Sequence, residues 1–245
     1  MDLDQRVVIV TGGSSGIGAH IVSDLLENNA QVIVADIQLP DAANRATGVD
    51  YRLCDITDRT SFKKFVDDVY HQYQRIDGLV NNAGVNRARL LVDYYSETPQ
   101  YKLSNDDFDF MVRVNQKGPF ICTQEGEYPF RGRHRRICYS ATKAAVHGFT
   151  LSWAKELGEF CIRVVGVAPG INEPTPMGDA KHREALAYTR GIKTTNIDED
   201  YSQKIPLGRQ GKLDEIANLV TCLLSDKSSY ITGTIINITG GKSRG

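Results

Sequence analysis

The chain has 245 residues, of which 41% are hydrophobic and 24% are charged, and its formal net charge is −1. This length suits one large α/β unit, so we expect residues 1–245 to form a single domain with a substantial core. An almost neutral chain lacks the positive charge that draws proteins to nucleic acids or to anionic membranes. Neither is therefore an expected partner.

The sequence also bears on compartment and metal content. Residues 1–5 are acidic and lead into a short apolar run, which is not the pattern of a signal peptide. No apolar run is long enough to span a bilayer. The five cysteines include no C-x-x-C pair, which is typical of reduced thiols in a cytoplasmic protein. The five histidines show no metal-ligand spacing, so we predict no metal site.

A glycine-rich turn follows the first predicted strand. Residues 7–10 are four consecutive β-branched residues, typical of a strand buried on both faces. The turn TGGSSGIG occupies residues 11–18, and residues 17–26 carry apolar side chains at helical spacing. Glycines let a pyrophosphate approach the backbone, and a helix N-terminus offers unpaired N–H groups. This order of elements predicts a phosphate site, with a tight turn that binds nothing as the alternative.

An acidic residue closes the second predicted strand, residues 31–35. Asp36 follows the glycines by about 20 residues, the spacing at which a carboxylate can accept hydrogen bonds from an adenosine ribose. The same carboxylate would repel a 2′-phosphate, so the cofactor that we predict is NAD and not NADP. The alternative is a purely structural aspartate at a strand end.

Strands and helices continue to alternate. We predict strands at 49–53, 78–80, 163–168 and 234–238, and helices at 60–73, 144–157 and 213–224. The alternation indicates an α/β fold with a Rossmann-like, doubly wound parallel sheet flanked by helices. Phe149 and Trp153 lie on an apolar helical stripe and are interpreted as core residues. The polar segment 171–206 follows a strand's carboxyl end, where α/β proteins place substrate-binding elements.

Tyr139 and Lys143 stand four residues apart in a predicted helix, so their side chains share one face. A phenol normally loses its proton near pH 10, and a nearby ammonium favours the phenolate and lowers that pKa. The pair can then transfer a proton for an alcohol/ketone couple. The same spacing also occurs by chance on solvated helix faces, so it needs a nicotinamide cofactor nearby to carry this meaning.

Four motifs in this order resemble those of the short-chain dehydrogenase/reductase family: the turn at 11–18, Asn81-Asn82-Ala83-Gly84, Tyr139-x-x-x-Lys143 and Pro169-Gly170. The resemblance implies that Tyr139 is the catalytic acid/base and that Lys143 also holds the nicotinamide ribose. It implies that Asn115 holds a helix kink and a water beside the lysine. Because the family is usually tetrameric, we expect a homo-oligomer, either a tetramer or a dimer.

The resemblance also implies a set of cofactor-binding residues. The family's glycines line the pyrophosphate, the residue at Asp55 meets the adenine, and the segment after Pro169 closes over the nicotinamide. Besides Tyr139 and Lys143, the positions carried over are Gly12, Ser14, Ser15, Gly16, Ile17, Gly18, Asp36, Ile37, Asp55, Ile56, Asn82, Ala83, Gly84, Pro169, Gly170 and Ile171.

A narrower resemblance links the chain to bacterial sorbitol-6-phosphate 2-dehydrogenases. Residues 86–93, 153–158, 185–190 and 238–245 carry it. It implies a sugar-alcohol phosphate as the small-molecule substrate, oxidised with NAD at a secondary alcohol to give fructose 6-phosphate. Arg87 and Arg89 follow the cofactor loop, where a guanidinium could clamp a phosphate. Solvated loop arginines are the alternative for both.

The family pattern breaks between Asn115 and Tyr139, which only 23 residues separate. A family member needs the end of a long helix, a central strand and a substrate-contacting serine there. The segment 126–137 is instead short and basic, and no serine lies between Asn115 and Tyr139. A buried parallel strand reads as a continuous apolar run, so the fifth, central strand is predicted to be missing or altered. We interpret this as a local deletion with a short frameshift.

Two alternatives to an active sorbitol-6-phosphate 2-dehydrogenase therefore stay open. The first is an NAD(H)-binding protein with impaired or no catalysis, because the serine and its strand are absent. The second is an enzyme that acts on another polyol or on a 3-oxoacyl substrate.

Overall fold

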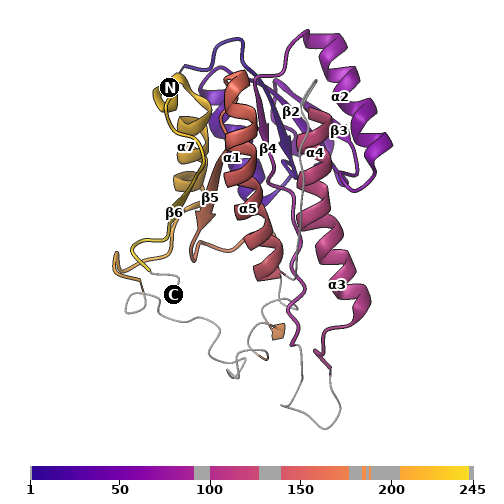
Figure 1. The fold of residues 1–245 in the computed structure, drawn as a ribbon, viewed down its shortest axis with the longest axis vertical. Helices are drawn as coiled ribbons and strands as arrows, with labels where there is room; N and C mark the ends of the chain where they lie inside the picture. The colour runs from indigo at the N-terminus through magenta and orange to yellow at the C-terminus, as the bar shows by residue number, and fades with distance from the viewer. Residues whose placement is uncertain are drawn as a thin grey trace.

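The computed structural model describes residues 2–90, 100–126, 139–176, 184, 185, 188 and 205–242, without the side chains of residues 126 and 139–141 (Figure 1). The strands are β1 (Val7–Thr11), β2 (Gln31–Asp36), β3 (Val49–Leu53), β4 (Gly78–Val80), β5 (Val165–Pro169) and β6 (Thr234–Ile238). The α-helices are α1 (Gly16–Glu27), α2 (Arg59–Tyr73), α3 (Asn105–Val112), α4 (Gly118–Gly126), α5 (Tyr139–Leu157) and α7 (Leu213–Leu224). The short helical segments are η1 (Ala42–Asn44), η2 (Arg113–Lys117, π-helical), η3 (Gly158–Phe160) and η7 (Asp226–Ser228).

The predicted α/β fold is confirmed. Strands β3, β4 and β6 and helix α7 begin and end at the predicted residues. Strand β5 begins at Val165 and not at the predicted residue 163. The parallel register of β5 with β6 starts at Val165 opposite Thr234. Val164 instead bonds the turn before β6: its N–H donates to the Thr232 hydroxyl at 3.0 Å, and its carbonyl oxygen accepts from the Gly233 N–H at 2.9 Å.

Helices cover both faces of the N-terminal sheet. Its four parallel strands have the order β3-β2-β1-β4, and β1 is buried along its whole length. Side chains alternate along the strands, so β1 and β2 send one set of residues toward α2 and α4 and the other toward α1 and α7. A strand covered on both faces explains the continuous apolar run in the sequence.

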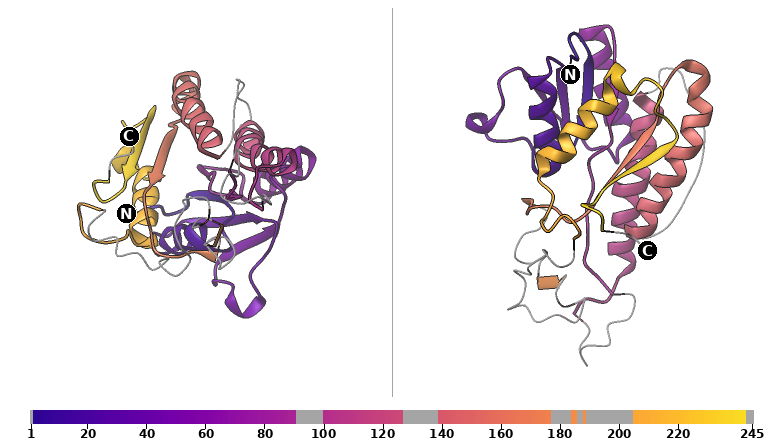
Figure 2. Two further views of the ribbon diagram at one scale, coloured as in Figure 1. Left: turned by 90° about the horizontal axis from the view of Figure 1, so that it is seen from below. Right: turned by 90° about the vertical axis from the view of Figure 1, so that its left-hand side faces the viewer.

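Among the described residues, β4 is the last strand on its side of the N-terminal sheet. Strand β5 pairs with β6 in a separate two-stranded sheet, and within the described part of the chain no strand joins β4 to β5 (Figure 2). Every residue of β4 and of β5 is only half-buried, in contrast to the fully buried β1. Residues 127–138, where the family's central strand is predicted to be missing or altered, lie outside the described part of the chain, so this point stays a prediction.

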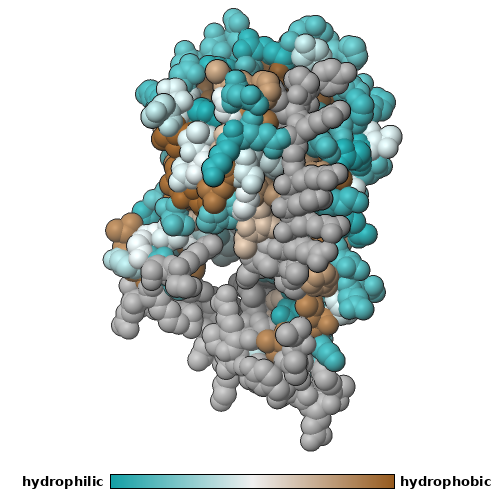
Figure 3. Space-filling view, viewed as in Figure 1, coloured by the Kyte–Doolittle hydropathy of each residue, from teal (hydrophilic) through white to brown (hydrophobic). Residues whose placement is uncertain are grey.

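Helix α5 packs through an aromatic stripe. Phe149 and Trp153 stack with their ring centroids 4.7 Å apart, and both are buried with Leu157 against the half-buried Phe120. The prediction that Phe149 and Trp153 are core residues is confirmed. Figure 3 shows mostly hydrophilic residues over α2, at the upper right of the view. None of the helices in the described ranges is both long and apolar enough to cross a membrane.

The N-terminus of α7 is held by a carboxylate whose titration should affect acid stability. Glu215 accepts hydrogen bonds from both terminal nitrogens of Arg209, at 2.6 and 2.9 Å, and from the Lys212 backbone N–H at 2.7 Å. The Arg209 guanidinium, and then the Lys212 N–H, lower the pKa of Glu215 to about 2. A carboxyl with a depressed pKa stabilises the fold above its unfolded pKa, and this contribution is lost as pH falls from about 4.5 to about 2.

Replacing Glu215 by glutamine should therefore lower the melting temperature at pH 7 and flatten its dependence on pH below 4.5. Melting curves of both proteins between pH 7 and pH 2.5 measure this. Glu27→Gln, on an exposed position at the end of α1, is the control. Parallel pH profiles for Glu215→Gln and the unsubstituted chain would contradict the assignment.

Candidate functional site

The glycine turn between β1 and α1 has no room for side chains. Gly12 and Gly16 have φ angles of +65° and +54°, a region that favours glycine. A Cβ on Gly18 would lie 2.1 Å from the Gly12 carbonyl oxygen. Ser15 is the N-cap of α1 but makes no side-chain cap hydrogen bond, so the first N–H groups of the helix have no side-chain acceptor among the described residues.

The loop after β4 fixes this turn from the side. The Asn82 side-chain amide donates to the Thr11 and Gly12 carbonyl oxygens at 3.0 and 2.9 Å. The Thr11 hydroxyl accepts from the N–H groups of Asn82 and Ala83 at 3.2 and 3.1 Å. Asn82, predicted as a cofactor residue, therefore holds the turn in shape through the ends of two adjacent strands.

Asp36 lies against the same turn. Its carboxylate accepts hydrogen bonds from the backbone N–H groups of Ser14 and Gln38, at 3.1 and 3.2 Å. The Ser14 hydroxyl is buried and has no hydrogen-bond partner among the described residues. A buried hydroxyl without a hydrogen-bond partner has a free-energy cost, and a bound acceptor such as a phosphate oxygen would remove it. The turn, the free helix N-terminus and this hydroxyl together fit a dinucleotide.

The predicted adenine-side residues differ in exposure. The Ile37 side chain is 70% exposed beside Asp36, where an aromatic ring could cover it. Asp55 is exposed and accepts from the Thr57 N–H at 2.8 Å. Ile56 is only 6% exposed and packs near Gly118, where a Cβ would meet it at 2.6 Å. The side chain of Ile56 thus belongs to the core, and only its backbone can reach a ligand at this edge.

Asn115 anchors the chain that leaves the cofactor loop. Its side chain accepts from the Val85 N–H and donates to the Val85 carbonyl oxygen, both at 2.7 Å, and Asn115 itself is fully buried. It lies in η2, a π-helical segment between α3 and α4, which is an irregularity of the kind expected at this position. No local sequence signal indicates the Val85 contact, since the two residues are 30 positions apart.

Lys143 lies beside this anchor. Around the position that a Cβ on Gly84 would take, Asn115 Oδ1 lies at 3.2 Å and Lys143 Nζ at 3.7 Å. Part of the Lys143 side chain reaches solvent, but burial around the ammonium lowers its pKa. Helix α5 begins at Tyr139, one turn before Lys143. The Tyr139 side chain lies outside the described part, so Lys143, Asn115 and Gly84 are the members of this group whose positions are known.

The segment after β5 approaches the glycine turn. Gly170 donates its N–H to the Ile238 carbonyl oxygen at 2.9 Å, and Ile171 accepts from the Gly211 N–H at 3.0 Å. A Cβ on Gly16 would lie 3.4 Å from the Thr175 Cβ. The segment that starts at Pro169 therefore reaches the N-terminus of α1, as a covering loop must. Thr175 was not among the predicted site residues, and no local motif distinguishes it in a polar segment.

Arg87 and Arg89 lie beside one acidic side chain. Both guanidiniums lie by the carboxylate of Asp107, a residue in the first turn of α3 that the sequence did not single out. Within the described ranges, no cluster of histidine, cysteine, aspartate and glutamate could hold a metal ion. The four described cysteines carry free thiols.

Two family models match successive parts of the chain. Residues 6–128 match the family model "short chain dehydrogenase", and residues 130–243 match the model "Enoyl-(Acyl carrier protein) reductase". One match ends and the other begins inside the segment 126–137, where the sequence departs from the family pattern.

Curated relatives match over the full chain. The chain is 44% identical to sorbitol-6-phosphate 2-dehydrogenase of Klebsiella pneumoniae, over 100% of this chain and 98% of the relative. That alignment spans 263 positions against 245 residues here, an excess of 18 in the relative. The chain is also 37% identical to 3-oxoacyl-(acyl-carrier-protein) reductase FabG of Thermotoga maritima, over 98% of this chain and 99% of the relative.

A solved structure shares the fold. The 3-ketoacyl-(acyl-carrier-protein) reductase of Brucella melitensis, complexed with NADH, superposes with a TM-score of 0.79 at 24% identity, covering 99% of this chain and 100% of that one. Fold, family models and full-length relatives agree: the chain belongs to the short-chain dehydrogenase/reductase family.

Proposed function

We propose that this oxidoreductase uses NAD to oxidise a secondary alcohol of a sugar-alcohol phosphate, converting sorbitol 6-phosphate to fructose 6-phosphate. The observation that carries the proposal is the 44% identity, along the whole chain, to a sorbitol-6-phosphate 2-dehydrogenase. The two arginines that follow the cofactor loop supply positive charge for a phosphate ester. The more distant likeness to a 3-oxoacyl reductase keeps a thioester substrate as the competing choice.

In the proposed complex, the glycine turn, the Ser14 hydroxyl and the α1 N-terminus hold the pyrophosphate, and Asp36 receives the adenosine ribose. Bound NAD would supply the acceptor for the hydride released from the alcohol carbon. Asp55, Ala83 and the covering segment from Pro169 flank the remaining cofactor surface. Every one of these groups lies at the carboxyl edge of the N-terminal sheet or on the segment that reaches it.

The alcohol proton goes to this chain's own residues. In the proposed reaction the Tyr139 phenolate accepts the hydroxyl proton while the alcohol C–H electron pair leaves as hydride, which gives the ketone and a neutral tyrosine. The Lys143 ammonium favours the phenolate by charge and bonds the nicotinamide ribose. Asn115 holds the Gly84–Val85 backbone next to that ammonium.

A second candidate is an NAD(H)-binding protein with little catalysis, and the short basic segment 126–137 favours it. The family's substrate-contacting serine has no counterpart between Asn115 and Tyr139. Loss of one such donor costs roughly 10² to 10³ in rate. The cytoplasmic location and the tetrameric or dimeric assembly also stay predictions.

Two measurements separate the candidates. Absorbance at 340 nm follows NADH production from NAD with sorbitol 6-phosphate, with sorbitol and, in reverse with NADH, with a 3-oxoacyl thioester. Fluorescence titration with NADH measures cofactor binding. Turnover of sorbitol 6-phosphate in preference to the others supports the proposal. Binding of NADH without any turnover supports the second candidate, and absence of binding contradicts both.

Asp36 should set the cofactor preference. Asp36→Ala removes the proposed ribose acceptor and the charge that repels a 2′-phosphate, so KM for NAD should rise about 10- to 100-fold while KM for NADP falls. The control is Asp41→Ala, an exposed carboxylate with no side-chain cap hydrogen bond in the loop after β2. If the ratio of the two KM values is unchanged in Asp36→Ala, Asp36 does not set the cofactor preference, and its role is limited to the hydrogen bonds with Ser14 and Gln38.

A further inference from the structure

Two arginines and one carboxylate form a compact group between the cofactor loop and α3. Arg89 Nε donates to Asp107 Oδ2 at 2.8 Å, and Arg87 Nε lies 3.8 Å from Asp107 Oδ1. Leu90 and Lys102 form a parallel bridge, and the Leu90 N–H donates to the Tyr101 carbonyl oxygen at 2.8 Å. This bridge keeps residues 85–90 against the segment that leads into α3. The group has two positive charges and one negative charge at neutral pH.

The two arginines are not equivalent. Arg89 is engaged on two sides, because its Nη1 also donates to the Ala88 carbonyl oxygen at 3.1 Å, and its side chain is only 24% exposed. Its guanidinium also lies over the Tyr101 ring, 5.8 Å from the centroid. Arg87 is 51% exposed, lies 5.1 Å above the Phe110 ring and donates no hydrogen bond to any other residue that the structure describes. Its donors remain available to a ligand.

Arg87 is also close in sequence to the proposed reaction centre. Asn115 clamps Val85 beside Gly84 and Lys143, and Arg87 follows Val85 by two residues. Two extended residues span about 7 Å, which fixes the Arg87 backbone within that distance of the clamp. A six-carbon sugar alcohol with its C2 near Lys143 would carry its phosphate at the far end of its carbon chain, a separation that an arginine side chain attached at position 87 can span.

We propose that Arg87 binds the phosphate of the substrate and that Asp107 is a positioning residue that sets this site through Arg89. The inference deepens the proposed function and rests on it. Arg87 presents a planar fork of N–H donors, which matches two phosphate oxygens. Asp107 holds the Arg89 guanidinium in place, so Arg89 supplies a second positive charge near the phosphate site. The same carboxylate attracts the Arg87 Nε. A neutral polyol lacks the charge that strengthens these hydrogen bonds, so the group selects the phosphate ester.

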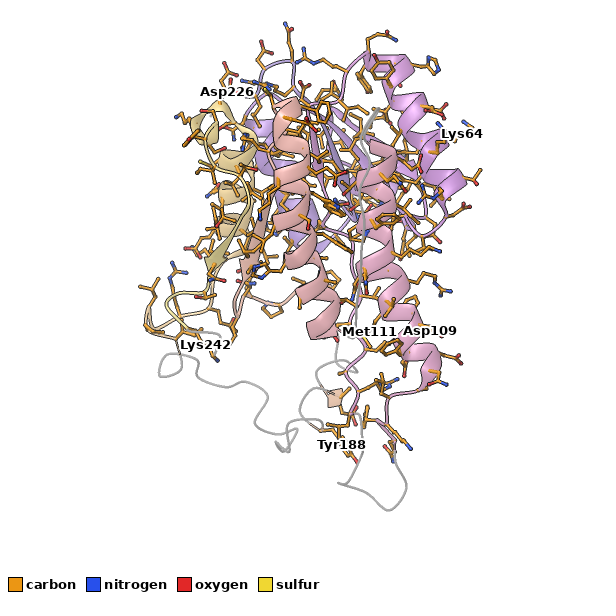
Figure 4. All side chains as sticks on the ribbon, viewed as in Figure 1. Lys64, Asp109, Met111, Tyr188, Asp226 and Lys242 are labelled. Atoms are coloured by element: carbon orange, nitrogen blue, oxygen red, sulfur yellow. The ribbon has the colours of Figure 1, made fainter. Side chains whose placement is uncertain are left out.

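The chain offers close controls for this assignment. Arg113 also lies over the Phe110 ring, 5.8 Å from its centroid, but makes no ion pair with Asp107. Asp109 is an exposed carboxylate on α3, two residues from Asp107, and Figure 4 shows it on the outer side of that helix. Arg113→Gln and Asp109→Asn thus remove a charge from the same neighbourhood and leave the proposed site intact.

Steady-state kinetics with sorbitol 6-phosphate and with sorbitol test the proposal. Arg87→Gln should raise KM for sorbitol 6-phosphate about 10- to 100-fold, with KM for sorbitol and the NADH dissociation constant unchanged. Asp107→Asn should raise the same KM by a smaller factor, about 3- to 10-fold, and leave kcat within a factor of two, because it acts through the arginines. Arg113→Gln and Asp109→Asn should match the unsubstituted chain.

Calorimetric measurement of sorbitol 6-phosphate binding to the NADH-loaded chain distinguishes failure of the phosphate site from failure of the proposed catalytic activity. If the chain binds sorbitol 6-phosphate more tightly than sorbitol but does not turn it over, the catalytic proposal fails and the phosphate site stands, provided that Arg87→Gln removes the difference. If Arg87→Gln weakens sorbitol and its phosphate equally, or changes neither, the phosphate site is overturned. Equal binding of the two ligands by the unsubstituted chain overturns it as well.

Discussion

Replacing Gly18 by alanine should abolish cofactor binding and destabilise the protein. The added Cβ would lie 2.1 Å from the Gly12 carbonyl oxygen and 2.6 Å from Asn82 Nδ2, and the backbone oxygen cannot rotate aside as a side chain could. The turn must move, and the hydrogen bond from Asn82 to Gly12 breaks with it. Overpacking and the lost bond together cost about 3 kcal/mol, which corresponds to a fall of roughly 6–12 °C in melting temperature.

NADH titration and thermal unfolding measure the two effects of Gly18→Ala. The dissociation constant of NADH should rise by at least about 100-fold, because the displaced turn no longer presents its N–H groups to the pyrophosphate. Gly148→Ala is the control, since a Cβ there meets nothing within 4 Å on helix α5. That change should raise stability by up to about 1 kcal/mol and leave NADH binding unchanged. Equal NADH affinity in the two variants would remove the glycine turn from the cofactor site.

The sequence predicted the strands of the buried sheet well because burial on both faces leaves a strong signal. The apolar runs at 7–10 and 31–35 correspond to β1 and β2, where alternate side chains enter two separate cores. The Tyr139-x-x-x-Lys143 spacing correctly placed Lys143 on a helix, and the structure sets its ammonium beside Gly84 and Asn115. These features depend on local periodicity and on short motifs, which a single sequence contains.

The contacts that give the site its shape could not be predicted, because they join segments far apart in sequence. Asp107 reaches Arg89 across 18 positions, and Asn115 reaches Val85 across 30. Nothing in the residue types around Asp107 distinguishes it from Asp106 or Asp109, since all three are carboxylates on the same short helix. The unequal roles of Arg87 and Arg89 follow only from which guanidinium that carboxylate holds.

Grafting the corresponding segment of the Klebsiella pneumoniae relative in place of residues 126–137 should raise both stability and activity. The relative has 18 more aligned positions than this chain has residues, enough for one strand and its turns. A strand placed between β4 and β5 would pair with the edges that the described residues leave open and would bury their half-exposed side chains. Unpaired edges also invite association between copies, which the graft should reduce.

The expected gain from the graft is large because it adds two ladders of backbone hydrogen bonds and several buried apolar side chains. At about 1 kcal/mol for each bond and about 2 kcal/mol for each side chain, less the cost of ordering the strand, several kcal/mol should remain. For a chain of this size that corresponds to a rise of roughly 10 °C or more in melting temperature. Restoring the serine donor should also raise kcat by roughly 10² to 10³.

Two control grafts separate repair of the sheet from repair of the chemistry. A glycine- and serine-rich insert of the same length closes no gap, and it should leave the melting temperature and kcat unchanged. The same graft with alanine at the position of the family's substrate-contacting serine should give the full gain in melting temperature without the gain in kcat. If the unaltered graft changes neither quantity, the chain has closed its sheet in another way, and the break in the family pattern does not limit its catalysis. If it raises both, the shortened segment 126–137 limits the stability and the activity of the unsubstituted chain. The glycine turn, Asp36 and Lys143 cannot account for the difference, because the graft leaves them unchanged.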